Sequence, residues 1–205
     1  MKLITKSLAM LLLATVCTAN NGNAQAFEKG KSYASIGYGF QLLPVKSLFK
    51  VYQDELGFKV KGMGPFTMKY EYAVSEKIGI GVAIGFTNAS IAWTWSDSSL
   101  NLSGNIENFN YSYKYSKLTI TPRFNYHLGD NEKIDPYIGL GIGFKKASYK
   151  LTTSDPFFNG ISFSGLPVSF EATFGIRGWF TDQIGAFAEI GAGHGFFQLG
   201  AVGKF

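Results

Sequence analysis

Residues 66–74 read FTMKYEYAV, a stretch in which apolar and polar side chains alternate without interruption. Five apolar side chains share one face: Phe66, Met68, Tyr70, Tyr72 and Val74. A period of two residues is typical of a β-strand with one apolar face. About ten residues of this pattern, each followed by a turn, recur up to the last residue, Phe205. The repeat indicates a membrane-spanning β-barrel, whose strands face lipid and lumen on alternate residues.

The alternation predicts eight strands, an even number as in bacterial single-chain barrels. We expect the first two strands at residues 32–42 and 66–74, a third that begins at residue 78 and a fourth that ends at residue 128. The last four are expected at residues 137–145, 168–177, 184–193 and 196–205. Short connections between the strands alternate with long ones, except for a tight turn near His194. Pro122 lies within an expected strand, where its missing N–H predicts a bulge. The expected fold class is all-β: an eight-stranded antiparallel up-and-down transmembrane β-barrel.

The first 26 residues predict a cleaved secretory signal peptide. Lys2 and Lys6 precede an apolar run from residue 8 to residue 16, and Ala24-Gln25-Ala26 provides the small residues that a signal peptidase recognises. The run is too short for a membrane helix, which needs about 20 residues. We therefore expect an outer-membrane barrel domain over residues 27–205. The alternative is a lipoprotein acylated on Cys17, although a bulky valine precedes that cysteine.

The composition excludes several classes of protein. Cys17 is the only cysteine, so the mature chain has no disulfide. The formal net charge of +5 includes Lys2 and Lys6 of the signal peptide, and no basic stripe or nucleic-acid-binding module accompanies it. Nucleic acid is therefore not an expected partner.

Charged side chains occur on the face that would point into the lumen. Their expected positions are Lys69, Glu71, Arg123, Lys145, Glu171, Arg177 and Glu189. Buried charges need partners, and eight strands enclose a space that side chains can fill. We expect a salt-bridged plug in which Lys145 contacts Glu171, with inward glycines making room for the long side chains. A gate or ion pathway is the functional alternative.

No catalysis, cofactor or metal is expected. The glycines of residues 139–143 and 191–195 alternate within strands, whereas a nucleotide-binding loop leads into a helix. The histidines His127 and His194 fall at opposite ends of the barrel and cannot share one ion. Neither belongs to a His-x-Ser pair, as in lipid A deacylases.

The apolar positions shift phase in the second long hairpin. They are even-numbered up to Phe86 and again from Leu118, but odd-numbered between them, at Ile91, Trp93, Trp95, Tyr111, Tyr113 and Tyr115. Matching shifts on both arms predict bulges where the hairpin leaves the membrane. The aromatic residues either pack on one another in a twisted extension or bind a surface glycan, lipid or protein. Lys46, Lys50, Lys59 and Lys61 add a neighbouring cationic cluster.

Four features carry a resemblance to a known family: NAQA at residues 23–26, DPYIGLGIG at 135–143, the strand with Glu189-Ile190-Gly191, and Phe205. The chain resembles the OmpA-type, porin-like outer-membrane β-barrel domain proteins common in Bacteroidetes. The resemblance implies an integral protein of the Gram-negative cell outer membrane, with long loops extracellular and both termini periplasmic. Its partners would be lipid, lipopolysaccharide and, through Phe205 as a C-terminal insertion signal, the barrel-insertion machinery. The peptidoglycan-binding domain of full-length OmpA proteins has no counterpart here.

The sequence thus predicts a structural or surface-interaction role without enzymatic activity. Two alternatives remain open. One is a narrow porin-like channel for small solutes. The other is a soluble lipocalin-like ligand-binding barrel, which would need an apolar interior.

Overall fold

The computed structural model describes residues 25–40, 59–97 and 107–205. The described residues form nine strands: β1 (Ser32–Phe40), β2 (Lys59–Ala73), β3 (Ile78–Asp97), β4 (Glu107–His127), β5 (Ile134–Thr153), β6 (Ile161–Ser164), β7 (Val168–Trp179), β8 (Ile184–Ala192) and β9 (Phe197–Lys204). Among them no helix is both long and apolar enough to cross a membrane.

Eight of these strands form a closed ring. Each strand pairs antiparallel with its neighbour along the chain, β1 pairs with β9, and β5 pairs with both β4 and β7. The four-residue β6 pairs with residues 148–151 of β5 and lies outside the ring. The fold is therefore an eight-stranded antiparallel up-and-down barrel, and the predicted fold class is confirmed.

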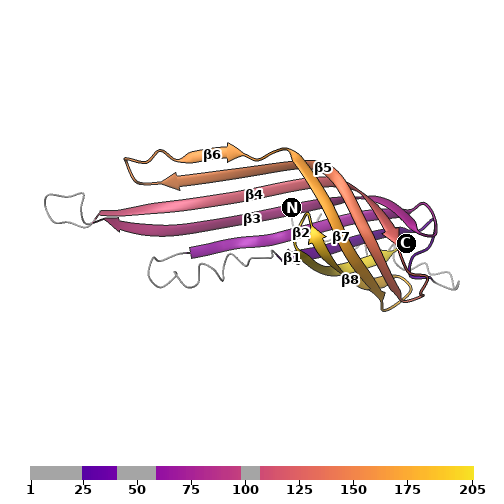
Figure 1. Ribbon diagram of the computed structural model, residues 1–205. Coiled ribbons are helices and arrows are strands. Elements are labelled where there is room, and N and C mark those ends of the chain that lie inside the picture. Colours follow the sequence, from indigo (N-terminus) through magenta and orange to yellow (C-terminus); the bar gives the residue numbers. More distant parts are fainter. Residues whose placement is uncertain (1–24, 41–58, 98–106) are drawn as a thin grey trace, which may run out of the picture.

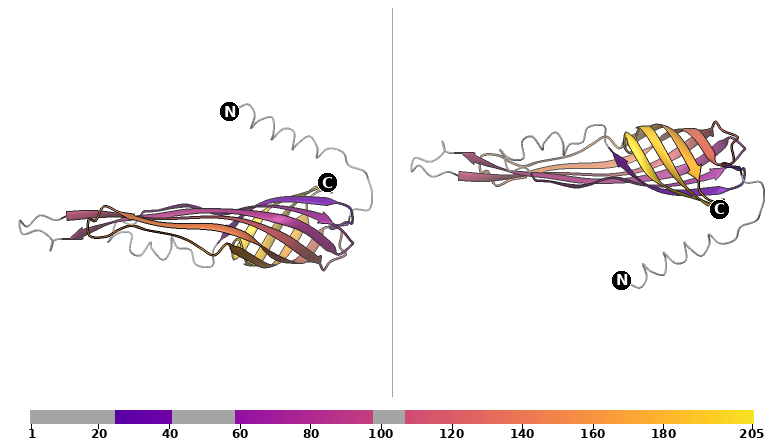
Figure 2. Two further views of the ribbon diagram at one scale, coloured as in Figure 1. Left: turned by 90° about the horizontal axis from the view of Figure 1, so that it is seen from above. Right: turned by 90° about the horizontal axis from the view of Figure 1, so that it is seen from below.

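One side of the barrel is much taller than the other. Strands β3, β4 and β5 contain 20, 21 and 20 residues, whereas β1, β8 and β9 contain nine or fewer. Figures 1 and 2 show these long strands continuing far beyond the ring as a sheet, which we call the sheet extension (described residues 59–63, 88–97, 107–117 and 146–164). The opposite end, with the short turns and Phe205, is called the base.

The apolar side of the strands switches between the ring and the sheet extension. In the ring the outer face is apolar, as at Leu140, Ile142 and Phe144, which are 53%, 61% and 58% exposed. In the extension the outer face is polar, with Asn88, Thr94, Asn110, Ser112, Lys114, Ser148, Lys150 and Thr152. The inner face, continuous with the lumen, carries the aromatic residues there. The apolar side chains therefore lie on the outer face in the ring and on the inner face in the sheet extension.

The switch involves no bulge between β3 and β4, so that prediction was wrong. Their register is continuous from Ile78↔Tyr126 to Asp97↔Glu107. The bulge predicted at Pro122 is also absent: Pro122 pairs with Val82, and the β4–β5 register is unchanged on either side of it. The missing proline N–H interrupts the β4–β5 pairing without shifting it. A register shift does occur in β2, between Met63 and Phe66.

A lysine placed on the outer face should reveal which part of the sheet lies in lipid. Leu140→Lys should lower the free energy of unfolding in lipid vesicles by about 2–4 kcal/mol, since it puts a charge in the apolar band. The control Thr152→Lys lies on the same strand and face but in the extension, and should change stability by less than about 0.5 kcal/mol. Equal effects in a denaturant titration would contradict the assignment of the lipid-facing band.

Candidate functional site in the lumen and on the sheet extension

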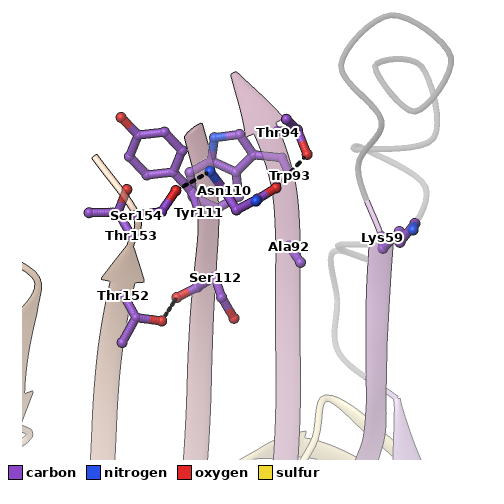
Figure 3. Close-up of a pocket in the computed structure, with 10 residues that line it drawn as sticks. All are labelled: Lys59, Ala92, Trp93, Thr94, Asn110, Tyr111, Ser112, Thr152, Thr153 and Ser154. Atoms are coloured by element: carbon purple, nitrogen blue, oxygen red, sulfur yellow. Dashed lines mark hydrogen bonds between the residues drawn. The ribbon is translucent and has the colours of Figure 1, made fainter. Parts of the chain in front are cut away.

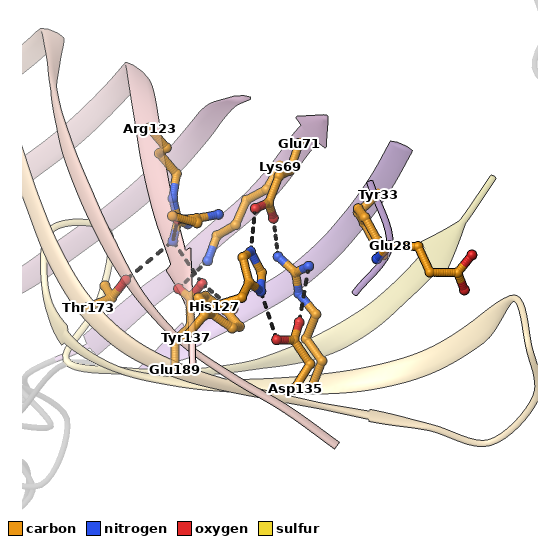
Figure 4. A network of polar contacts seen from close by, with 12 residues as sticks. Glu28, Tyr33, Lys69, Glu71, Arg123, His127, Asp135, Tyr137, Thr173 and Glu189 are labelled. Atoms are coloured by element: carbon orange, nitrogen blue, oxygen red, sulfur yellow. Dashed lines mark hydrogen bonds and ion pairs between the residues drawn. The ribbon is translucent and has the colours of Figure 1, made fainter. Parts of the chain in front are cut away.

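The lumen is filled by charged side chains that alternate with the outward-facing apolar residues. Strand alternation directs them inward from β2, β4, β5, β7 and β8. Figure 4 shows most of them converging on one another across the barrel. Six of the seven residues predicted from the sequence meet here: Lys69, Glu71, Arg123, Glu171, Arg177 and Glu189.

Glu189 is the centre of this network. Its carboxylate pairs with Lys69, accepts a hydrogen bond from Arg123 Nη2 at 3.1 Å and accepts another from the Tyr137 hydroxyl at 2.7 Å. The Glu189 side chain is 1% exposed, so water contributes little to its solvation. Three donors from three different strands therefore stabilise one buried charge.

A second cluster lies nearer the base. His127 Nδ1 is 2.7 Å from Asp135 Oδ1, and His127 Nε2 is 2.8 Å from Glu71 Oε1. Arg177 pairs with Glu71, and its Nη1 lies 3.6 Å from Asp135 Oδ2. A neutral imidazole has one N–H, whereas an imidazolium can donate to both carboxylates at once. The geometry therefore fits a charged His127 held between two anions.

Arg123 joins Glu189 to a third cluster nearer the extension. Arg123 Nη1 lies 3.1 Å from Glu171 Oε1, and His194 Nδ1 lies 3.5 Å from Glu171 Oε2. His194 belongs to the tight β8–β9 connection and is 1% exposed. It folds into the barrel mouth instead of projecting outward, so the three clusters form a continuous column along the lumen.

Glycines provide the space for these long side chains, as the sequence predicts. A Cβ at Gly79 would lie 1.8 Å from Glu71 Oε1, and one at Gly139 would lie 2.4 Å from Arg123 Nη2. Gly85 has the same relation to His194, at 1.9 Å from Cδ2. The long charged side chains of the lumen therefore pack into space that the glycines leave free.

Sequence reasoning missed four members of this network. His127 and His194 were judged only as candidate catalytic or metal-binding residues, Asp135 lies before the strand expected at residues 137–145, and Tyr137 was not counted among the charges. Parity was the available signal: Asp135 and Tyr137 share the odd-numbered inward face of β5. Among the described residues, no group of three or more histidine, cysteine or acidic side chains could hold a metal ion.

The predicted contact between Lys145 and Glu171 was wrong. The register places Gly141 opposite Glu171, so Lys145 lies four residues further toward the extension. Among the described residues Lys145 forms no ion pair; it lies near Lys117 on the inner face of β4. Burial, and to a lesser degree Lys145, lowers the pKa of the Lys117 ammonium, which lies beyond the apolar band. Two cations therefore face the space above the barrel.

Above these lysines the inner face of the sheet extension is aromatic. Trp93 stacks on Tyr111, with ring centroids 5.3 Å apart and planes 7° apart. Tyr115 contacts Tyr149 at 5.0 Å, and Tyr149 stacks on Phe163 of β6 at 4.7 Å. We call this set, with Trp95 and Tyr113, the aromatic face.

Two tyrosine hydroxyls of the aromatic face have defined surroundings. The Tyr111 hydroxyl donates to Asp155 Oδ2 at 2.9 Å. Burial, and less strongly Tyr149, raises the pKa of Tyr115 to about 12, so this phenol stays neutral. Of the predicted cationic cluster, Lys59 and Lys61 pair with Ala92 and Ser90 and so share their outer face, while Lys46 and Lys50 lie outside the described residues.

A pocket of about 550 Å³ opens near the tip of the sheet extension, across β2 to β5 (Figure 3). Its polar groups mostly satisfy one another: the Thr94 hydroxyl donates to Asn110 Oδ1 at 2.9 Å, and the Asn110 N–H donates to Ser154 Oγ at 2.9 Å. Its lining residues are Lys59, Ala92, Trp93, Thr94, Asn110, Tyr111, Ser112, Thr152, Thr153 and Ser154.

No protein-family model matches this sequence, and no curated protein matches it. Solved structures with a similar fold include Ail, the attachment invasion locus protein of Yersinia pestis (20% identity over 87% of this chain and 100% of that chain, TM-score 0.44). A second is the N-terminal β-barrel domain of Pseudomonas aeruginosa OprF (11% identity over 86% of this chain and 98% of that chain, TM-score 0.43). A third is the Yersinia pestis outer membrane protein Ail in a phospholipid bilayer nanodisc (22% identity over 86% of this chain and 100% of that chain, TM-score 0.40). At these identities the likeness extends to the fold alone. The chain thus resembles small outer-membrane barrels.

Removing the carboxylate at the centre of the network should be costly. Glu189→Gln leaves Lys69 and Arg123 without their shared anion and should lower the free energy of unfolding by about 3–5 kcal/mol. The control Asp130→Asn breaks the exposed contact with Lys77 at 3.7 Å and should cost about 0–1 kcal/mol.

A double-mutant cycle with Lys69→Met gives the coupling between the two charges. The double variant should lose less stability than the two single variants together, because no unpaired lysine remains. Additive losses in urea titrations, or a Glu189→Gln variant as stable as Asp130→Asn, would contradict the buried network.

In contrast to Glu189→Gln, the variant Lys145→Ala should hardly change the stability of the protein. Since Lys145 forms no ion pair among the described residues and lies near Lys117, its removal should leave the free energy of unfolding within about 0.5 kcal/mol of the parent. Lys69→Ala provides the matched case of a paired lysine. A loss at Lys145 as large as that at Lys69 would show that Lys145 has an anionic partner.

Proposed function

We propose that this protein is an integral outer-membrane barrel with a closed lumen, which presents the aromatic face of its sheet extension as a binding surface outside the cell. The observation that carries this proposal is the switch of the apolar side between ring and extension. An apolar outer face suits lipid, whereas a polar outer face with an aromatic inner face suits a structure standing in water.

The orientation follows from the two ends of the barrel. In bacterial barrels the short turns lie on the periplasmic side and the longer connections lie outside. The base has the short turns and Phe205, so we place it in the periplasm. Phe205 is paired with Ser32 through both backbone groups and is 41% exposed, which suits an aromatic signal for the insertion machinery.

The ion pairs in the lumen favour a plug over a channel. Glu71, Glu171 and Glu189 each contact at least one basic side chain, and the column extends from the base cluster to His194. A narrow porin-like channel remains the second candidate for the same fold. Planar-bilayer recordings separate the two: the plug predicts no steady conductance, and a reproducible single-channel current would favour the channel.

The ligand class we propose for the aromatic face is an anionic glycan. Aromatic rings form an extended platform for flat, partly apolar sugar rings, and aromatic residues dominate binding hot spots. Lys117 and Lys145 add positive charge at the lower end of this platform, where the described residues offer Lys145 no acidic partner. Surface polysaccharides and the sugars of lipopolysaccharide have this chemistry.

Two matched polymers test this binding: dextran sulfate and uncharged dextran. Titration into the detergent-solubilised protein should quench tryptophan fluorescence with the sulfate and not with dextran. Trp93→Ala with Tyr113→Ala should weaken binding at least tenfold, while Thr94→Ala with Ser112→Ala, on the outer face, should leave it unchanged. Lys117→Ala with Lys145→Ala should reduce its salt dependence. Equal responses to both polymers, or no response in a folded barrel, would contradict the proposal.

A further inference from the structure

The first described residues of the chain cover the base of the barrel. Ala26 and Phe27 are 1% and 4% exposed and pack with Tyr33, Trp179 and Val202. The Phe27 ring lies parallel to the His127 imidazole, with centroids 3.4 Å apart, and stacks on Tyr33 at 5.2 Å. Phe27 therefore covers the cluster in which His127 is held between Glu71 and Asp135.

Polar contacts fix the same segment, residues 25–28, which we call the base cap. The Ala26 N–H donates to Asn131 O at 3.0 Å. Lys204 Nζ donates to Gln25 O and to Glu28 Oε1, both at 2.8 Å. The Glu28 N–H donates to the Tyr33 hydroxyl at 2.7 Å. Gln25 and Ala26 are thus part of the folded barrel and not a tail attached to it.

We infer that signal peptidase cleaves after Ala24, so that the mature chain begins at Gln25 and keeps the whole base cap. Two bonds satisfy the requirement for small residues one and three positions before the cut: the bond after Ala24, preceded by Gly22, and the bond after Ala26, preceded by Ala24. The sequence alone favours the second bond, and the contacts of the base cap favour the first. This inference rests on the proposed export of the chain through a signal peptide.

Cleavage after Ala26 would remove structure that the barrel uses. The hydrogen bond from Ala26 to Asn131 and one of the two acceptors of Lys204 would be lost. A new ammonium group would form on Phe27, a residue that is 4% exposed while Gln25 and Ala26 are in place, and one residue before Glu28, whose carboxylate binds the Lys204 ammonium. Burying a charge beside a like charge is unfavourable. Cleavage after Ala24 places the new ammonium on Gln25, which is exposed.

The mass of the protein purified from outer membranes decides between the two bonds. We expect the mass of residues 25–205, with or without the loss of ammonia that an N-terminal glutamine can undergo. A mass beginning at Phe27 would overturn this inference and leave the signal peptide in place. A chain that retains Met1 would overturn the signal peptide itself.

Two variants test the specificity of the cut. Ala26→Leu changes the small residue next to the second bond only, and we expect it still to be processed after Ala24. Gly22→Leu changes the first bond only, and we expect unprocessed precursor or a cut shifted to Ala26. Normal processing of Gly22→Leu after Ala24, or loss of processing in Ala26→Leu, would contradict the inference. Processing is measured on total cell protein, so the result does not depend on how well Ala26→Leu folds.

Discussion

The closed ring of backbone hydrogen bonds is the constraint on which the rest of this structure depends. Lipid offers no partner to an unpaired N–H or C=O, so a sheet crossing it must close, here through the pairing of β1 with β9. Eight strands leave an interior of side-chain width. Whatever points inward must then fill that space and satisfy its own charges, which explains why glycines and long ion-paired residues occur together in the lumen.

The same chain is organised differently a few residues beyond the ring. Past Phe86, Leu118 and Phe144 the strands stay in register, but the polar side chains move to the outer face and the aromatic ones to the inner face. The β3–β4 and β4–β5 registers do not change at this level, whereas β2 shifts its register on β3 between Met63 and Phe66. Under the proposed function, one continuous sheet is a membrane anchor in the ring, around the ion-paired lumen, and a surface for recognition in the sheet extension.

The alternation of side chains predicted the fold, because an apolar outer face and a lumen impose the same two-residue period on every strand of the ring. Parity determines which face a residue shares, and six of the charged residues assigned to the inner face form ion pairs in the lumen. The alternation could not predict which residues pair across the barrel. The predicted contact between Lys145 and Glu171 was wrong because the register of β5 on β7 decides how far along the barrel each residue lies. His127 and Asp135 were missed for a related reason. They contact each other across the short β4–β5 connection, which parity alone does not indicate, and their other partners, Glu71 and Arg177, come from β2 and β7.

The central claim is that lipid surrounds the ring alone, and that the chain reverses its apolar side where the lipid ends. Single cysteines, introduced into a cysteine-free mature chain and labelled with a membrane-impermeant maleimide in lipid vesicles, test it most directly. The account predicts that cysteines at Ile138, Leu140 and Ile142 stay unlabelled in vesicles and react once detergent-denatured, while those at Ser148, Lys150 and Thr152, on the same face of β5, react in both conditions. Uniform labelling along this face of β5, or protection of its extension half, would contradict the account.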